Sequence, residues 1–268
     1  MCDSRLNVKS QTPSSVFRQV RCGQALVLCL LLFVAPPLRA DSHYLPDGRP
    51  DGVALLAPPP AHGSPEEAAD LLAARAVFNG RTEAEKERAF KDATLSIFLY
   101  APAIGSFFQP GKFPKTEALF QKVRKDVSEP LDRTKNHWKR QRPYQLDPQL
   151  ALGRPETSYG YPSGHATRGM LQALLLAELF PQQREAILVI GRQIGWDRVL
   201  IGKHFPADVH AARVLGQALA RELLASPAFQ RDLAEAKAEV QAAATGPDNV
   251  KAGLHSDAAQ LPSTVPAL

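Results

Sequence analysis

Three short segments of this chain carry side chains that could bind an anion and catalyse a reaction on it. They are "KNHWKRQRP", "PSGH" and "DRVLIGKHFPAD", at residues 135–143, 162–165 and 197–208. Together they supply lysine, arginine, serine, histidine and aspartate. Those side chains stabilise negative charge, transfer protons and act as nucleophiles.

The first segment places Lys135 and Arg142 on either side of a short run. Because a residue before proline avoids the helical conformation, Pro143 should turn Arg142 out of any preceding helix. A guanidinium binds two phosphate oxygens at once, and an ammonium adds a point charge. The alternative is a solvated basic face, since Lys139 and Arg140 belong to the same run.

The second segment predicts the first turn of a helix, because the apolar run "MLQALLLAELF" follows it closely. Ser163 is a natural N-cap, and glycine at position 164 lets the backbone approach an anion closely. The unpaired N–H groups and the positive dipole end of a first turn bind anions. His165 would then be placed to give a proton to a leaving group. The alternative is an ordinary N-cap with an incidental histidine.

The third segment offers a second guanidinium, Arg198, and a histidine with a carboxylate four residues later. Pro206 suits the first helical position, so Asp208 falls in the first turn and can reach back to His204. A carboxylate that accepts one ring N–H leaves the other nitrogen as a nucleophile. The alternative is that Asp208 only caps the helix. His210 is predicted to be a surface histidine.

Taken together, the segments contain the groups that phosphoryl transfer needs: dispersed positive charge, an in-line nucleophile and an acid. We predict His204, oriented by Asp208, as the nucleophile and His165 as the acid on the opposite side. The predicted phosphate-binding residues, called the phosphate cradle below, are Lys135, Arg142, Ser163, Gly164 and Arg198.

The order and spacing K-x6-R-P, P-S-G-H and R-x5-H-x3-D resemble the type 2 phosphatidic-acid phosphatase superfamily. Within it, the chain looks most like the bacterial class A non-specific acid phosphatases, over residues 64–226. The resemblance implies an all-helical domain, a phosphohistidine on His204, and neither a metal nor another cofactor. One position departs from the pattern, because Asp197 replaces the usual serine before Arg198. We expect Asp197 to point away from the pocket and to pair with a neighbouring cation.

The resemblance makes a secreted phosphomonoesterase the favoured function, with phosphotransferase activity as an extension. A vanadium-dependent haloperoxidase resembles this pattern in the same pocket, with vanadate in the phosphate position. A soluble lipid-phosphate phosphatase and a non-enzymatic phosphate-binding helical protein are further alternatives. The expected partners are small phosphomonoesters and inorganic phosphate, and the resemblance implies a homodimer or a larger homo-oligomer.

The elements that must position these residues are helices. Cap signals at Ser64 and Thr82 begin two of them, and residues 164–180, 182–203 and 206–225 predict three more. Strand signals are scarce, so we predict an all-α fold, a compact helical bundle over residues 64–233. Residues 41–63, rich in Pro and Gly, predict an extended arm. Residues 234–268, rich in Ala and then in Gly, Pro and Ser, predict a flexible tail.

The first forty residues have the pattern of a secretory signal peptide: basic residues, the short apolar run "ALVLCLLLFVA", and a small residue at Ala40. An uncleaved membrane anchor is the alternative. These residues carry +4 of the net charge of +5, from five Lys or Arg and one Asp, so the basic pI is no evidence for nucleic-acid binding. All three cysteines also lie there. We expect a periplasmic or secreted protein, without disulfides and without a membrane span after cleavage.

Overall fold

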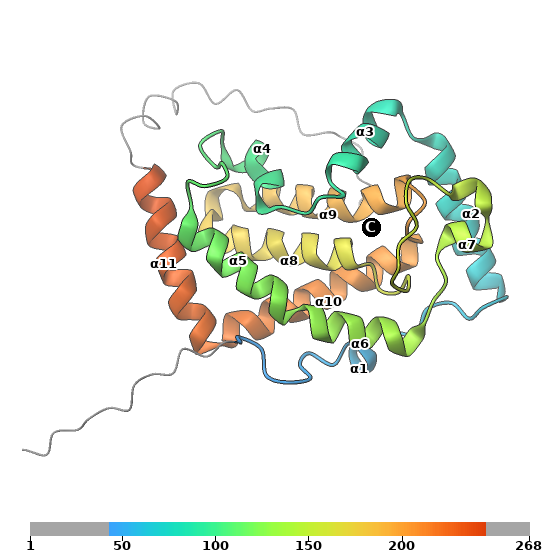
Figure 1. Ribbon diagram of the computed structural model, residues 1–268, viewed down its shortest axis with the longest axis horizontal. Helices are drawn as coiled ribbons and strands as arrows, with labels where there is room; N and C mark the ends of the chain where they lie inside the picture. Colours follow the sequence, from blue (N-terminus) through green and yellow to red (C-terminus); the bar gives the residue numbers. More distant parts are fainter. Residues whose placement is uncertain (1–42, 245–268) are drawn as a thin grey trace, which may run out of the picture. The chain divides into compact units, whose positions relative to one another are not determined.

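The structure is a computed structural model that describes residues 43–244, and Figure 1 shows its helices. Within that range all regular structure is helical, so the predicted all-α fold class is confirmed. The predicted signal peptide and the last part of the predicted tail lie outside the described residues. The α-helices are α1 (Gly52–Leu55), α2 (Pro65–Gly80), α3 (Glu83–Lys91), α4 (Ala101–Ile104), α5 (Pro114–Asp126), α6 (Ser128–Trp138), α7 (Pro143–Leu146), α8 (Gly164–Leu179), α9 (Arg184–Leu200), α10 (Pro206–Ala225) and α11 (Pro227–Ala244). Short 3-10 helices cover Ile97–Tyr100, Pro148–Leu150 and Pro181–Gln183.

Helix α8 is the centre of the bundle and packs mainly against α9 and α10 (Figure 1). Most of its residues are buried, which explains why the sequence there is largely apolar. The backbones of α8 and α9 approach closely at Gly191, where a Cβ atom would lie 2.5 Å from Cβ of Ala173. This close contact fixes the direction of α8, and so the position of its first turn.

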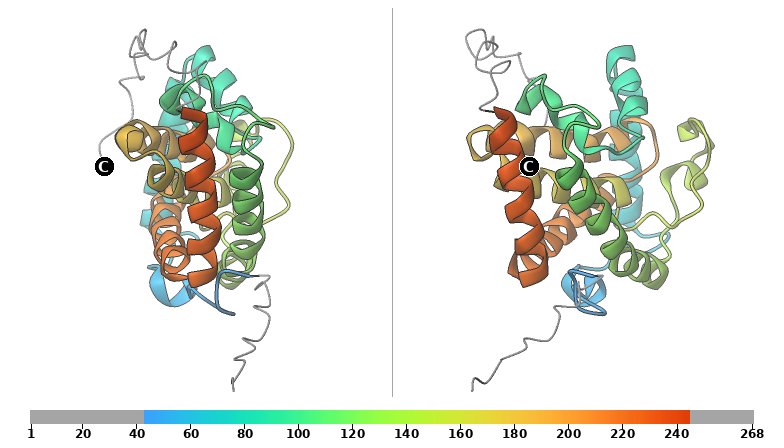
Figure 2. Two further views of the ribbon diagram at one scale, coloured as in Figure 1. Left: turned by 90° about the vertical axis from the view of Figure 1, so that its left-hand side faces the viewer. Right: turned by 60° about the vertical axis from the view of Figure 1, so that its left-hand side comes forward.

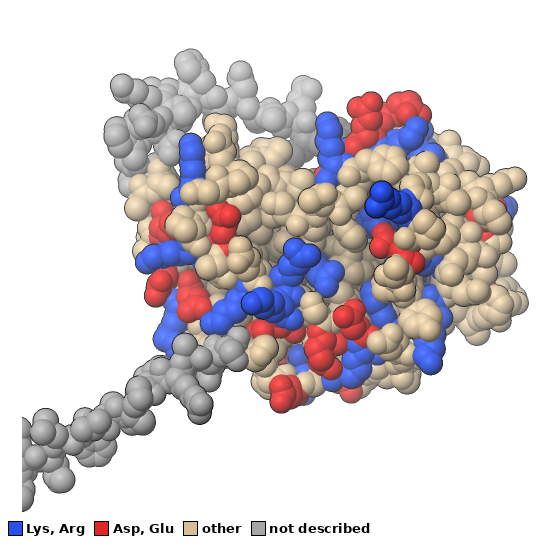
Figure 3. Space-filling view, viewed as in Figure 1, with Lys and Arg blue, Asp and Glu red and all other residues tan. Residues whose placement is uncertain are grey.

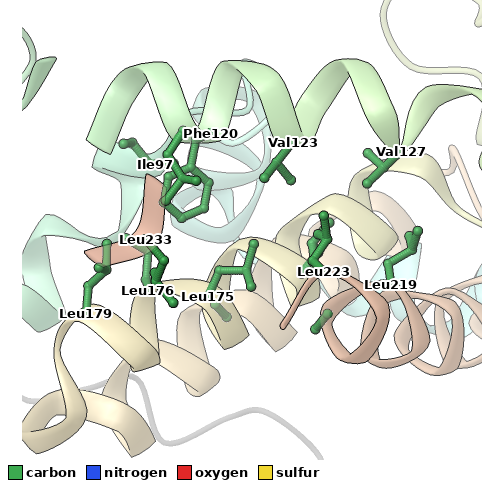
Figure 4. Close-up of a cluster of buried hydrophobic side chains, with 14 of the residues drawn as sticks. Ile97, Phe120, Val123, Val127, Leu175, Leu176, Leu179, Leu219, Leu223 and Leu233 are labelled. Atoms are coloured by element: carbon green, nitrogen blue, oxygen red, sulfur yellow. The ribbon is translucent and has the colours of Figure 1, made fainter. Parts of the chain in front are cut away.

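Helix α5 closes one side of the core. Phe120, Val123 and Val127, at or just after its C-terminal half, face leucines of α8, α10 and α11 (Figure 4). Burying one such side chain stabilises the fold by about 1.5–3 kcal/mol. These residues recur at helical spacing along α5, and the chain bends at Val127, between α5 and α6.

The predicted boundary of the C-terminal tail is wrong, because residues 234–244 continue helix α11. Figure 2 shows α11 beside α5. Phe229, Leu233 and Val240 are buried at helical spacing. Glu239 accepts hydrogen bonds from the backbone N–H of Lys115 and from Thr116 at the start of α5. The Ala-rich composition hid this amphipathic pattern.

The predicted extended arm is largely non-helical but is neither wholly extended nor loose. It contains the short helix α1, and Tyr44 and Leu56 are buried in the main core. The backbone N–H of Tyr44 donates to the buried carboxylate of Asp126 on α5. Short-range turn signals predicted the irregular backbone, whereas these contacts join residues about eighty positions apart.

Candidate active site

The first turn of α8 is built as the sequence predicted. Oγ of Ser163 accepts a hydrogen bond from the N–H of Ala166 (3.4 Å), so Ser163 caps the helix. The N–H of Ser163 donates to the carbonyl of Asp208 (3.0 Å), which ties the start of α8 to the start of α10. A Cβ atom on Gly164 would lie 3.8 Å from Cε of Lys135 and 3.7 Å from Nη1 of Arg168. The first turn of α8 is therefore flanked by cations.

His204 and Asp208 make the predicted contact. Nδ1 of His204 lies 3.1 Å from Oδ2 of Asp208, and both side chains are almost fully buried. On the other side of the ring, Nε2 lies 3.1 Å from Nη1 of Arg142. Because a guanidinium only donates, Nε2 is the acceptor and Nδ1 carries the hydrogen. The lone pair of Nε2 therefore points at Arg142, one of the predicted phosphate-binding residues.

The turn before His204 depends on Gly202. This residue has φ +67°, in the left-handed region that favours glycine, and a Cβ atom there would lie 2.3 Å from the carbonyl oxygen of Leu150. Pro206 then starts α10, as predicted, and places Asp208 in its first turn. The backbone N–H of Phe205 donates to Oδ2 of Asp208 (3.0 Å). Asp208 is thus both a helix cap and a partner of His204.

The sequence left a solvated basic face as the alternative for the run that contains Arg140, and for Arg140 that alternative is wrong. Its side chain is 2% exposed, and its Nη1 donates to Oδ1 of Asp208 (2.6 Å). Its Nη2 donates to Oδ2 of Asp70 on α2 (2.8 Å). The guanidinium lies over the ring of Phe205, 4.1 Å from its centre. Contacts therefore run from Asp70 through Arg140 and Asp208 to Nδ1 of His204, and we call this series the Asp70–Arg140–Asp208–His204 relay. Lys139, next to Arg140, is exposed, as that alternative predicted.

Two cations of the phosphate cradle are held by neutral groups. Nζ of Lys135 donates to the carbonyl of Tyr159 (2.6 Å). Arg142 has the extended backbone predicted from Pro143, and its guanidinium donates to the carbonyls of Ser158 (2.9 Å) and Lys203 (2.9 Å). Carbonyl partners orient a cation without neutralising its charge. The charge of both groups therefore remains available to an anion.

Arg198, the third cation, is buried and pairs with the carboxylate of Glu156. Glu156 lies on the irregular segment between α7 and α8 and was not identified from sequence, because no helical or motif spacing relates it to Arg198. Burial raises the pKa of the Glu156 carboxyl. The charges of Arg198 and Arg142 lower it by more than burial raises it, so the net shift of the pKa is downward. An ionised carboxylate therefore borders the cations of the cradle.

Burial sets the protonation of the site. It lowers the pKa of His204 well below its ordinary value, with Arg142 as the next cause, so the ring is a neutral base. Burial, followed by the charge of Arg142, lowers the pKa of Lys135 to about 7. Burial raises the pKa of Asp208 to about 6, and the charge of Arg140 opposes that rise.

His165 faces a different set of neighbours. Its Nε2 lies 3.0 Å from the carbonyl oxygen of Ala93, and since a carbonyl only accepts, Nε2 carries a hydrogen there. Nδ1 is then the ring atom available to take up and deliver a proton. Burial, followed by the charge of Arg198, lowers the pKa of His165 to about 4. The ring is therefore neutral at mildly acidic pH before an anion binds.

Asp197, which replaces the usual serine, pairs with a neighbouring cation as expected. Its Oδ1 accepts from Nη2 of Arg88 on α3 (3.0 Å) and from Nε2 of Gln193 (2.7 Å). Burial, followed by a hydrogen bond with Asp197, raises the pKa of the neighbouring Asp92 carboxyl to about 7. Asp92, Asp197 and Arg88 therefore join the end of α3 to α9. Asp92 directly precedes Ala93 in the chain. His210 is exposed, as predicted.

Within residues 43–244, no helix is both long enough and apolar enough to cross a membrane. The family model described as "PAP2 superfamily" matches residues 123–232, which contain all the predicted site residues.

Three curated relatives match most of the chain. An acid phosphatase from Zymomonas mobilis is 30% identical, covering 78% of this chain and 83% of that protein. A non-specific acid phosphatase from Providencia stuartii is 29% identical (82% and 95% covered), and one from Salmonella typhimurium is 28% identical (80% and 91% covered). Because the similarity spans nearly the whole length of these relatives, the chain belongs to the PAP2 superfamily, in the branch of the bacterial non-specific acid phosphatases.

Proposed function

We propose that the protein hydrolyses phosphate monoesters through a phosphohistidine intermediate on His204. The observation that carries this proposal is the orientation of the buried His204 ring. Its Nδ1–H is held by Asp208 at 3.1 Å, and its Nε2 lone pair points toward Arg142 at 3.1 Å. A phosphoryl group that binds Arg142 in place of this contact would therefore meet the unprotonated nitrogen of a neutral imidazole, which is the form that acts as a nucleophile.

In the first step, Nε2 of His204 attacks the phosphorus atom and the bond from phosphorus to the leaving oxygen breaks. His165 gives its proton to that oxygen, and the alcohol departs. Lys135, Arg142 and Arg198 stabilise the negative charge on the equatorial oxygens, together with the N–H groups at the start of α8. Asp208 stabilises the positive charge that develops on the His204 ring.

In the second step, a water molecule attacks the phosphorus atom and the bond from Nε2 to phosphorus breaks. His165, now neutral, takes a proton from the water and returns to its acidic form. Inorganic phosphate leaves, and His204 is again a neutral ring. If another alcohol replaces water in this step, the same chemistry transfers the phosphoryl group.

The proton on His165 must arrive with the substrate, because burial keeps its pKa near 4 in the empty site. A phosphate monoester exchanges its second proton with a pKa of about 6. Below that pH the monoanion of the substrate brings one proton into the site. The negative charge of the bound phosphate offsets the positive charge of Arg198, which lowers the pKa of His165 in the empty site, so binding raises that pKa. The proposal therefore places the highest kcat/KM on the acidic side of neutrality.

We further propose that the protein is secreted or periplasmic and acts on small, soluble phosphate esters as a homo-oligomer. The charge of the cradle comes from lysine and arginine, so the mechanism uses no metal. Supporting observations are the named activity of the relatives and the signal-peptide pattern of residues 1–40. Dialysis against EDTA should leave the activity unchanged.

The test is phosphohistidine trapping in the purified protein with p-nitrophenyl phosphate. An alkaline quench followed by peptide mass spectrometry should place a phosphoryl group on His204, and His204→Ala should abolish both the adduct and turnover. His210→Ala changes an exposed histidine in the helix that follows His204, so it is the matched control and should keep full activity. Turnover by His204→Ala, or a phosphoryl group on another residue, would contradict the mechanism. Halide oxidation with vanadate and peroxide would instead favour the haloperoxidase alternative.

A further inference from the structure

A cavity of about 350 Å³ lies beside His165, and the described residues that line it do not include His204. Its apolar wall comes from α5, α8 and the segment after α3, and includes Leu95, Phe120 and Leu171. Arg124 on α5 and Arg168 on α8 also line it, and no Asp or Glu of residues 43–244 is among its lining residues. Figure 3 shows Lys and Arg side chains on this face, between α5 and α3.

Arg168 is half-buried without a close carboxylate partner among the described residues. Its Nη2 lies 3.5 Å from Oγ of Ser128, and its buried Nε has no hydrogen-bond partner there. Burial, followed by the charge of Arg124, lowers the pKa of its guanidinium, and Asp132 only partly offsets this. Oε1 of Gln172, which also lines the cavity, is buried and unpaired among the described residues. Two cations and an unpaired amide therefore face a partly apolar space.

The position of this cavity relates it to the leaving group of the reaction. His165 lines the cavity and is the proposed acid, so the leaving group that it would protonate lies at a ring that borders this space. Nη1 of Arg168 lies 3.7 Å from the position of a Cβ atom on Gly164, in the phosphate cradle. Arg168 thus lies between the bound phosphoryl group and the cavity, within reach of what the phosphoryl group is attached to.

We propose that this cavity is a leaving-group subsite that selects esters whose alcohol has an apolar body and a second anionic group. This inference rests on the proposed phosphatase activity. Volumes of about 300 Å³ or more hold small organic ligands. The apolar wall would bind a ring or a short chain, and Arg124 and Arg168 would bind a carboxylate, a sulfonate or a second phosphate.

The test compares kcat/KM for 2-naphthyl phosphate and for 6-sulfo-2-naphthyl phosphate, which differ in one negative charge on the leaving group. The ratio of the two values, anionic over neutral, should exceed 1 in the unchanged protein. Arg168→Gln should lower that ratio about tenfold, and Arg124→Gln, at a more exposed position, about threefold. Arg168→Lys keeps the charge and should retain most of the ratio. Arg184→Gln changes an arginine that pairs loosely with Glu178 (3.8 Å) away from the cavity, and should leave both values unchanged.

The outcomes separate the two proposals. Suppose that both esters are hydrolysed. If the anionic-over-neutral ratio is then at or below 1 in the unchanged protein, or if the Arg168 and Arg124 variants keep the ratio of the unchanged protein, the subsite is refuted and the phosphatase activity stands. An equal loss on both esters in Arg168→Gln would also refute it, since Arg168 would then bind the transferred phosphoryl group. If neither ester is hydrolysed, the proposed function fails and the subsite fails with it. Calorimetric binding of both esters to His204→Ala gives the same comparison without turnover, should an arginine variant fold poorly.

Discussion

Arg140→Gln tests whether the relay behind His204 sets the charge of Asp208. The substitution removes the cation that lies 2.6 Å from the fully buried Asp208 carboxylate. Breaking a buried ion pair costs about 3–5 kcal/mol, and one pKa unit corresponds to about 1.4 kcal/mol. Taking the lower value, the pKa of Asp208 should rise by about two units from its value of about 6, to about 8.

The kinetic effect follows from the fraction of Asp208 that is ionised. At pH 6 about half of the unchanged protein carries the carboxylate, against about 1% of the variant, so kcat/KM should fall about fiftyfold. The sign is set by the raised pKa: the carboxylate form is lost as the pH falls through it. At pH 8 the variant should be within about twofold of the unchanged protein. Arg140 is therefore a positioning residue whose signature is a shifted pH profile.

The assay is kcat/KM for p-nitrophenyl phosphate between pH 5 and 8, expressed as variant over unchanged protein at each pH. Arg140→Lys keeps a positive charge and should lose less at pH 6. Arg75→Gln is the matched control, because Arg75 pairs with Asp147 (2.8 Å) at a part-exposed position on α2. Urea unfolding checks that each variant is folded. A ratio that does not change with pH, or an unchanged rate at pH 6, would refute the reasoning.

Three further predictions concern the cradle and its support. Because the pKa of Lys135 is lowered to about 7, its charge is lost above that pH; the Michaelis constant for p-nitrophenyl phosphate should rise through pH 7, and Lys135→Arg should remove much of that rise. Glu156→Gln should lower the inhibition constant of inorganic phosphate about threefold to tenfold, since the carboxylate competes for Arg198; an unchanged constant would exclude that competition. Gly191→Ala should lower the free energy of unfolding by about 1–3 kcal/mol in urea, whereas Gly80→Ala, where a Cβ meets no atom within 4 Å, should not lower it.

Much of the fold could be predicted because its signals are local. Pro206 at the first helical position predicted the start of α10, and the span of that helix agrees with the structure. Thr82 and Glu85 form the predicted capping box at the start of α3. The error at α11 arose because an Ala-rich composition is compatible with both a solvated tail and a helix. Contact with α5 decides between them, and that contact is not local in the sequence.

In the candidate site, too, contacts between residues close in the sequence were predictable and contacts between distant residues were not. The contact between His204 and Asp208 was predictable because they lie four positions apart at the start of a helix. Arg140 was not, since it follows the end of α6 and its partners Asp208 and Asp70 lie about seventy positions away, on α10 and α2. Nothing in the run around Arg140 distinguishes a buried cation from a solvated one. Only the packing of α2 against α10 brings two carboxylates to it.

Asp197, which stands where the family pattern has serine, supports the segment that orients His165. Its carboxylate accepts a hydrogen bond from Arg88 of α3 at 3.0 Å, and it also shares a hydrogen bond with the carboxyl group of Asp92. The next residue, Ala93, supplies the carbonyl that orients His165, and Ala93 and Leu95 line the cavity. Replacing Asp197 with serine would remove the carboxylate that ties α3 to α9, so it should weaken the orientation of His165 more than it improves the binding of phosphate. Loss of rate on poor leaving groups, with little change in the inhibition constant of phosphate, is the expected result for Asp197→Ser; a sharply improved Michaelis constant would instead mean that Asp197 repels the phosphoryl group.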